Sequence, residues 1–158
     1  MKPHIQKLLD LQLPLPSAIS DARANCFNAV ELFWEDESQP KFSAPQDFVT
    51  YLAKSFLQTS NEVERWPLDV AVVWSRSANV LKFGEIKIES ISRRDSGYPF
   101  GLVIEHSFVQ LDETTVFQKR DPSATGGYEL VSLEQALRPY IGAVGFEVTH
   151  HRRRKSKL

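Results

Sequence analysis

Residues 100–119 read FGLVIEHSFVQLDETTVFQK, and this stretch decides the fold. Its apolar, aromatic and β-branched content predicts a long strand from Phe100 to Leu111 and a second strand from Thr115 to Lys119. Only a few polar residues separate the two strands. We therefore expect an antiparallel hairpin, which is the nucleus of an antiparallel sheet.

The expected register of this hairpin brings two polar side chains together. A turn about Asp112 pairs Gln110 with Thr114 and His106 with Gln118. Directly opposed residues have Cβ atoms about 4.5–5.5 Å apart. We therefore expect the side-chain oxygen of Gln118 to accept a hydrogen bond from the imidazole of His106.

The rest of the chain adds helices before the hairpin and mixed elements after it. Periodicity and end signals predict three helices: one capped by Ser20–Asp21 or by Asn25 and ending at 35–40, one from a Ser43/Gln46 capping box to about Gln58, and a short one opened by a Ser132/Gln135 capping box. We also expect strands over 70–74, 80–91 and 144–149. Loops are expected over 92–99 and 121–128. Strands segregated from helices indicate an α+β fold.

Length and composition indicate a single domain. The chain has 158 residues, of which 42% are hydrophobic and 25% charged, as in globular proteins. We expect an N-terminal lead-in over 1–19, a catalytic domain over 20–149 and a basic, disordered tail over 150–158. Five of the 19 basic residues lie in the last seven positions, so the remaining 14 face 20 acidic residues, a net charge of −6. This balance argues against a nucleic-acid binder.

The ends of the chain bear on its location. The first residues contain no continuous apolar segment, so we expect no signal peptide, and no segment has the length of a membrane span. The location stays open, and we expect a chain that is cytoplasmic or exported by a non-classical route. The C-terminal Ser156-Lys157-Leu158 matches a peroxisomal address, which is a weak signal at three residues. Oligomeric state stays open.

Cys26 is the only cysteine, and it lies where a helix is expected to begin after Asn25. The positive end of the helix dipole lowers the pKa of a thiol at this place. In this interpretation Cys26 is a nucleophile, His106 its general base and then the acid for the leaving amine, and Gln118 the residue that orients His106. The backbone N–H of Cys26 would bind the oxyanion. We expect no cofactor and no metal.

Each of these residues also has a purely structural interpretation. A lone cysteine on an apolar helical stripe is commonly part of the core, a half-buried histidine is commonly satisfied by hydrogen bonds, and a glutamine near a strand end is commonly solvated. Other groupings are weaker. His150-His151 has no further ligand at metal spacing, and nothing in the sequence brings Glu105 and Glu129 together as a carboxylate pair.

The chain resembles the NlpC-like cysteine peptidases and amidases of the papain-like superfamily. Four stretches carry the resemblance: Ala24–Val30 looks like the nucleophile helix, Trp66–Val73 is similar to the first core strand, which usually opens Pro-Gly-Asp, Glu105–Leu111 looks like the histidine strand, and Thr115–Lys119 looks like the strand of the third triad residue. The chain departs from the family at Phe27-Asn28, where Ser-Gly is common, and at Leu68, where Gly is usual.

The resemblance implies a papain-like, NlpC-type fold with the nucleophile helix packed on an antiparallel sheet. It implies hydrolysis of a peptide-like amide by a Cys26–His106–Gln118 triad through a thioester, with a peptide or a bacterial peptidoglycan stem-peptide fragment as substrate. Two alternatives stay open. One is a related thiol acyltransferase or deamidase, and the other is a catalytically silent domain that binds a partner through its surface and basic tail.

Overall fold

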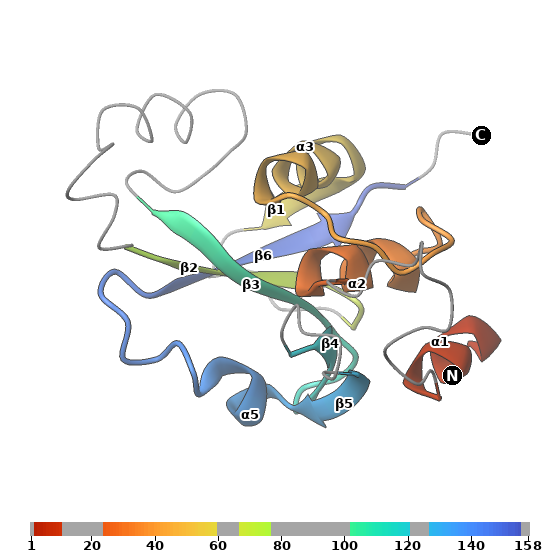
Figure 1. Ribbon diagram of the computed structural model, residues 1–158. Helices are drawn as coiled ribbons and strands as arrows, with labels where there is room; N and C mark the ends of the chain where they lie inside the picture. Colours follow the sequence, from red (N-terminus) through yellow and green to blue (C-terminus); the bar gives the residue numbers. More distant parts are fainter. Residues whose placement is uncertain (1, 11–23, 60–66, 77–101, 121–126, 156–158) are drawn as a thin grey trace.

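The computed structural model describes residues 2–10, 24–59, 67–76, 102–120 and 127–155, which form helices packed on a six-stranded sheet (Figure 1). The helices are α1 (Pro3–Leu9), α2 (Cys26–Phe33), α3 (Pro45–Ser55) and α5 (Leu133–Leu137). The strands are β1 (Phe56–Thr59), β2 (Val70–Ser75), β3 (Val103–Gln110), β4 (Thr115–Lys119), β5 (Tyr128–Ser132) and β6 (Glu147–Arg153). The expected α+β class is confirmed.

The sheet has the strand order β1-β6-β2-β3-β4-β5, and every neighbouring pair is antiparallel. Strands β3, β4 and β5 follow one another in space as in the chain, whereas β6 returns to lie between β1 and β2. All six residues of β2 are buried. This central strand is apolar without alternation because both faces of the sheet are covered there.

Two cores lie on opposite faces of the sheet. The larger core joins α1, α2 and α3 to alternate residues of the strands, among them Val72 on β2 and Val109 on β3. The smaller core joins α5 and the segment after it to the other residues, among them Val73 and Phe108. Figure 1 shows α2 and α3 on one side of the sheet and α5 on the other. The core that a strand residue joins therefore shows on which face of the sheet its side chain lies.

Helix α2 begins at the predicted place. The side chain of Asn25 accepts from the Asn28 amide at 3.2 Å and from the Ser43 amide at 3.2 Å, and its own amide group donates to the Ser43 carbonyl at 2.8 Å. This cap satisfies a free N–H at the helix start and joins the helix to the segment before α3. All eight residues of α2 are buried, so the helix is part of the core along its whole length.

The second helix differs from its prediction at both ends. It begins after Ala44 with Pro45 in its first turn, and no side chain caps it, so the expected Ser43/Gln46 capping box is wrong. The Ser43 hydroxyl instead donates to the carboxylate of Glu31 on α2. The helix ends at Ser55, and Phe56 begins a strand that the apolar helical periodicity concealed. The Ser132/Gln135 capping box is confirmed.

The predicted register of the hairpin is wrong by two residues. Gln110 pairs with Val116 rather than with Thr114, and Val109 pairs with Phe117. The Asp112 side chain accepts from the amide of Thr114 at 2.9 Å and so stabilises a longer turn. Because a shift of two residues keeps every side chain on its own face, the polar pair of the hairpin survives the error.

The expected disordered tail from residue 150 is also wrong for its first part. Residues 150–153 form the end of β6, and Arg152 and Arg153 bind carboxylates within the fold. Arg152 contacts Asp69 at 3.1 Å, and Arg153 contacts Asp36 at the end of α2. These basic residues hold β6 in place. The closing strand predicted over 144–149 accordingly begins and ends later.

Several predicted segments lie outside the described residues. These are most of the lead-in, the strand over 80–91, the loop over 92–99, most of the loop over 121–128, and the last three residues. Strand β5 was not predicted, although it follows directly after the second loop. Within the described part of the chain, no helix combines the length and the apolar character that a membrane span needs.

Candidate cysteine and histidine site

His106 and Gln118 meet as the sequence predicts. His106 Nε2 lies 2.7 Å from Gln118 Oε1, and both side chains are buried, with 2% and 3% of their surfaces exposed. The structure pairs β3 with β4 only at Val109 and Gln110, so the two side chains join the strands beyond the backbone ladder. The His106 ring also stacks on Tyr140, with 5.3 Å between ring centroids.

Gln118 is bonded at both ends of its amide group. Its Nε2 donates to Glu129 Oε1 at 2.9 Å, and Glu129 lies directly opposite Gln118 in the β4–β5 ladder. Glu129 also accepts from Arg120 Nε at 3.1 Å. Sequence reasoning missed Glu129 as a partner because strand β5 was not foreseen. The available signal was the short run of β-compatible residues Tyr128, Leu130 and Val131 between the Gly126-Gly127 pair and the Ser132 cap.

Cys26 lies at the first turn of α2 and packs against β3. The Ser107 hydroxyl donates to the Cys26 carbonyl at 3.1 Å, so the residue that follows His106 is in direct contact with the cysteine. Sequence reasoning missed Ser107 as well. A small hydroxyl residue among Phe108, Val109 and the other apolar residues of the strand was the available signal.

The pKa of the Cys26 thiol is opposite to the sequence expectation. Burial raises it to about 11. Hydrogen bonds from the amide and hydroxyl of Ser107 and from the amides of Cys26 and Phe27 act to lower it, but desolvation outweighs them. At neutral pH the sulfur is therefore protonated in this conformation, and the expected thiolate at the helix N-terminus is wrong.

The structure places Cys26 and His106 on opposite sides of strand β3. Ser107 pairs with Val72 and faces α2, whereas His106 pairs with Val73 and faces the smaller core. Both residues are described, and the structure has no hydrogen bond between the Cys26 thiol and the imidazole. His106 and Gln118 thus form a hydrogen-bonded pair, whereas Cys26 contacts Ser107, the residue next to His106 on β3.

Burial also changes the protonation of His106. It lowers the imidazole pKa, while the hydrogen bond to Gln118 and the charge of Glu129 act in the opposite direction. His106 is therefore neutral at pH 7. A neutral imidazole carries one N–H and one lone pair, so it can accept a proton from a neighbouring group.

The other candidate groupings do not form sites. His150 and His151 point to opposite faces of β6, and the described residues contain no cluster of three groups that could hold a metal ion. Glu105 accepts from Ser75 at 2.7 Å, whereas Glu129 binds Gln118, so the hydrogen bonds of the described residues do not join these carboxylates.

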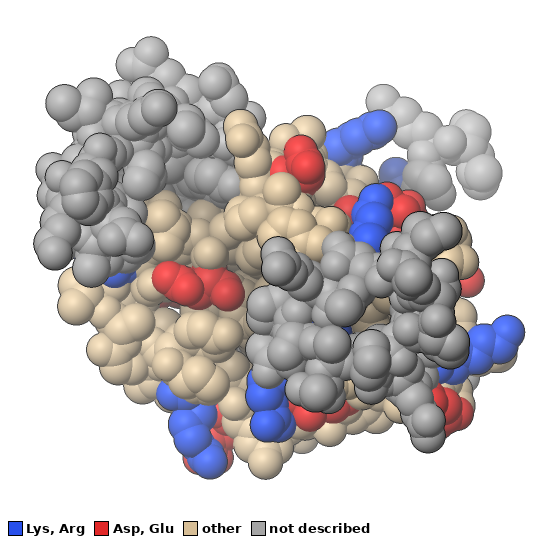
Figure 2. Space-filling view, viewed as in Figure 1, with Lys and Arg blue, Asp and Glu red and all other residues tan. Residues whose placement is uncertain are grey.

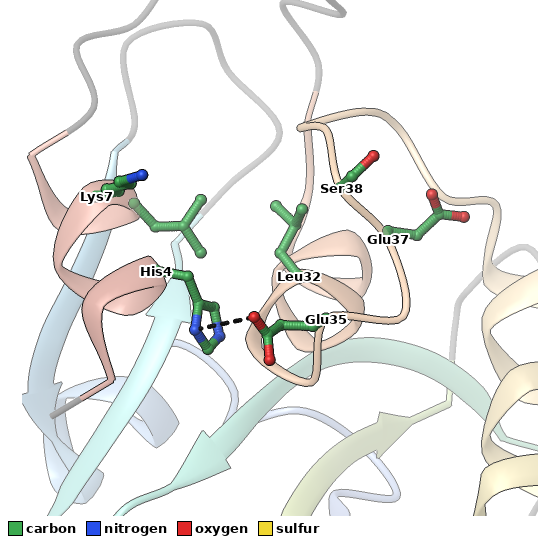
Figure 3. A pocket seen from close by; sticks show the side chains of 7 residues that line it. His4, Lys7, Leu32, Glu35, Glu37 and Ser38 are labelled. Carbon is green, nitrogen blue, oxygen red and sulfur yellow. Dashed lines mark ion pairs between the residues drawn. The ribbon is translucent and has the colours of Figure 1, made fainter.

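A cavity of about 290 Å³ lies beside the other end of α2 (Figure 3). The residues that line it come from α1, from α2 and from the segment after α2, and they are His4, Lys7, Leu8, Leu32, Glu35, Glu37 and Ser38. His4 Nδ1 lies 3.5 Å from Glu35 Oε1. The lining includes none of the candidate residues, and the cavity is at the end of α2 that lies away from Cys26.

Charged side chains are interspersed on the face shown in Figure 2. Among the described residues visible there, Lys and Arg do not gather into a continuous basic patch. On this face, the described residues therefore offer no basic patch for an anionic polymer, and Arg152 and Arg153 are held in ion pairs with Asp69 and Asp36.

Comparisons of the chain with protein-family models, with curated proteins and with solved structures found no match.

Proposed function

We propose that this protein is a thiol-dependent hydrolase of peptide-like amides, with Cys26 as nucleophile, His106 as general base and Gln118 as the residue that orients His106. The observation that carries the proposal is the 2.7 Å hydrogen bond between His106 Nε2 and Gln118 Oε1. With an oxygen as the partner of Nε2, the proton of the neutral ring lies on Nε2. Nδ1 then keeps the lone pair that a general base requires.

Hydrogen-bond donors near the start of α2 also support the proposal. The Ser107 hydroxyl donates to the Cys26 carbonyl on the face of β3 that packs against α2. Hydrogen bonds from the amides of Ser107, Cys26 and Phe27 act to lower the pKa of the thiol, although burial outweighs them. Donors of this kind would stabilise negative charge that develops on the sulfur or on a carbonyl oxygen bound beside it.

In the proposed reaction the thiol and the imidazole begin as a neutral pair. The sulfur attacks the amide carbon while its proton moves to Nδ1 of His106. The protonated imidazole then transfers this proton to the leaving amine as the C–N bond breaks, which leaves a thioester on Cys26. Water activated by His106 hydrolyses the thioester and releases the acid and the free thiol. Sγ and Nδ1 lie on opposite sides of β3 in this structure, so the reaction requires a conformational change that brings Cys26 and His106 to one face of the sheet.

The likeness of four stretches to the NlpC-like cysteine peptidases suggests the substrate class. On this basis we propose a papain-like fold of the NlpC type and a peptide or a peptidoglycan stem-peptide fragment as substrate. A transferase or a deamidase with the same three residues would form the same thioester. Product analysis separates them: a peptidase releases an acid and an amine, a deamidase releases an acid and ammonia, and a transferase passes the acyl group to another acceptor.

The test uses the fact that Cys26 is the only cysteine, so that every thiol adduct detected by intact mass is an adduct of this residue. A peptidyl aldehyde or epoxide should modify the wild-type protein, and His106→Ala should slow the modification by about 100-fold. Iodoacetamide should react slowly at pH 7 in both proteins because the thiol is protonated. Equal rates of peptidyl modification in both proteins, or product release from stem peptides by Cys26→Ala, would contradict the proposal.

A second candidate function is favoured by the burial of the thiol and by its separation from the imidazole across β3. In this alternative Cys26 is a core residue, the His106–Gln118 pair stabilises the sheet, and the domain binds a partner without chemistry. It predicts that no peptidyl electrophile reacts faster than iodoacetamide. It also predicts that His106→Ala lowers stability and leaves the labelling rate of the folded protein unchanged.

A further inference from the structure

The amide group of Gln118 could be placed in two orientations that fill the same space. Its oxygen and nitrogen differ little in size, and a half-turn about the last side-chain bond exchanges them. One orientation presents an acceptor to His106 and the other presents a donor. Because His106 and Gln118 are both buried, no bulk water is available to correct a mismatched pair.

Glu129 determines which orientation is adopted. A carboxylate only accepts hydrogen bonds, so the Gln118 NH₂ group must face Glu129 Oε1, at 2.9 Å. Arg120 donates to both oxygens of Glu129, at 3.1 and 3.3 Å, and so fixes the orientation of this carboxylate. The remaining end of the Gln118 amide, its oxygen, is thereby directed to His106.

The tautomer of His106 follows from this arrangement. An oxygen at 2.7 Å from Nε2 requires an N–H at Nε2, and in the neutral ring the lone pair then lies on Nδ1. The reversed amide would require the opposite tautomer, with the proton on Nδ1. We propose that Glu129 is a positioning residue that fixes the Gln118 amide and, through it, the Nε2–H tautomer of His106. The catalytic meaning of this tautomer rests on the proposed function.

The backbone supports a specific role for Glu129. Five consecutive pairs join β4 to β5, and Gln118 is directly opposite Glu129 among them. The Glu129 side chain is 28% exposed, so it reaches from solvent to a buried pair.

The experiment uses ¹⁵N NMR at pH 7 to determine which ring nitrogen of His106 carries the proton. In the wild-type protein we expect a protonated Nε2 and an unprotonated Nδ1. Glu129→Leu removes the acceptor, and we expect it to produce a mixture of both tautomers. A folded Glu129→Leu protein that retains only the Nε2–H tautomer would overturn the proposal.

Glu129→Gln removes the charge of the side chain and keeps its hydrogen-bond acceptor. This variant also keeps the proposal testable if Glu129→Leu does not fold. Its oxygen still accepts from Arg120 and from Gln118, so we expect the native tautomer to persist. The groups around the His106 ring are Gln118 on β4, Glu129 on β5 and the Tyr140 ring in the segment after α5, and Glu129 is the acidic group among them. We therefore expect the pKa of His106 to fall in Glu129→Gln, and an unchanged pKa would also count against the proposal.

Glu134→Gln is the matched control, because Glu134 is exposed on α5 and pairs with Arg138. It should leave the His106 nitrogens unchanged. The tautomer is measured without substrate, so the result does not depend on turnover. A wild-type protein that cleaves no amide removes the proposed function, whereas an unaltered tautomer in Glu129→Leu removes only the positioning role.

Discussion

Glu35 occupies a backbone conformation that suits glycine. It follows Trp34, the C-cap residue of α2, and has φ at 61°. The Glu35 amide donates to the Leu32 carbonyl and the Asp36 amide to the Glu31 carbonyl, at 3.1 and 3.0 Å. These two bonds form a Schellman motif, in which glycine is preferred at the position of Glu35 because a Cβ atom there is strained.

We expect Glu35→Gly to raise the free energy of unfolding by up to about 1 kcal/mol, because the strain of the left-handed conformation is relieved. Glu35→Ala is the control, since it removes the ion pair with His4 and keeps the Cβ atom. Urea unfolding of the three proteins measures the difference. A glycine variant no more stable than the alanine variant would show that the strain is negligible.

Residue chemistry explains which parts of the site could be foreseen. The His106–Gln118 hydrogen bond was predictable, although the register was not, because strand alternation places both side chains on the same face of the hairpin. The protonation of Cys26 was not predictable. The dipole at the start of a short helix is a local property, whereas the desolvation that outweighs it comes from α3, β3 and the rest of the core, which the local sequence does not reveal.

At the scale of elements, the described helices and strands appear where periodicity was strong. Helix α2 and the apolar run of β2 were foreseen. Strands β1 and β5 were missed because each is short and directly adjoins a helix. The residues of β1 continue the apolar periodicity of α3, and β5 ends at the residue that caps α5. Leu68 provides another example. It has φ at 74°, which favours glycine, at the position where the resemblance noted a missing Gly.

Asn25 provides the prediction that belongs to this scale, because its side chain joins α2 to the segment before α3. We expect Asn25→Ala to lower the free energy of unfolding by about 2 kcal/mol or more, since the cap is lost and buried groups at Ser43 become unpaired. Asn25→Asp retains the acceptor and loses the donor, and should cost less. Thermal and urea unfolding measure both.

Ser132→Ala is the exposed counterpart of this experiment. It removes one half of the capping box of α5, where water can replace the lost hydrogen bond. We expect a cost of about 1 kcal/mol or less. Equal losses for Asn25→Ala and Ser132→Ala would mean that the contact of Asn25 with Ser43 does not contribute to the stability of the protein.

At the scale of the whole molecule, the C-terminal strand completes the sheet. β6 lies between β1 and β2, so residues near the end of the chain pair with strands that are far away in the sequence. A run of arginines reads as a solvated tail when only local composition is considered. Its ion pairs with Asp36 and Asp69 depend on this long-range pairing, which explains why the sequence pattern alone predicted disorder.

The same strand contains a buried histidine that makes stability depend on pH. His151 Nε2 lies 2.9 Å from Thr149 Oγ1, which also accepts from the Trp74 indole at 2.8 Å. Burial, followed by the neighbouring His150, lowers the pKa of His151 from 6.5 to about 4. Between these two values the unfolded chain binds a proton that the folded protein does not bind, so acid favours unfolding.

We therefore expect His151 to cause no loss of stability above pH 6.5, where it is neutral. The free energy of unfolding should fall as the pH decreases from 6.5 toward 4. The pKa difference corresponds to a loss of about 3 kcal/mol. Burial lowers the pKa of His106 too, which adds to the loss with the same sign.

Urea unfolding at a series of pH values measures the slope of stability against pH, and His151→Gln should make this slope shallower because the titrating ring is removed. A slope that is the same in the variant and in the wild-type protein would show that His151 is not the group responsible, and a wild-type protein that gains stability on acidification would contradict the neutral, buried state of the histidine.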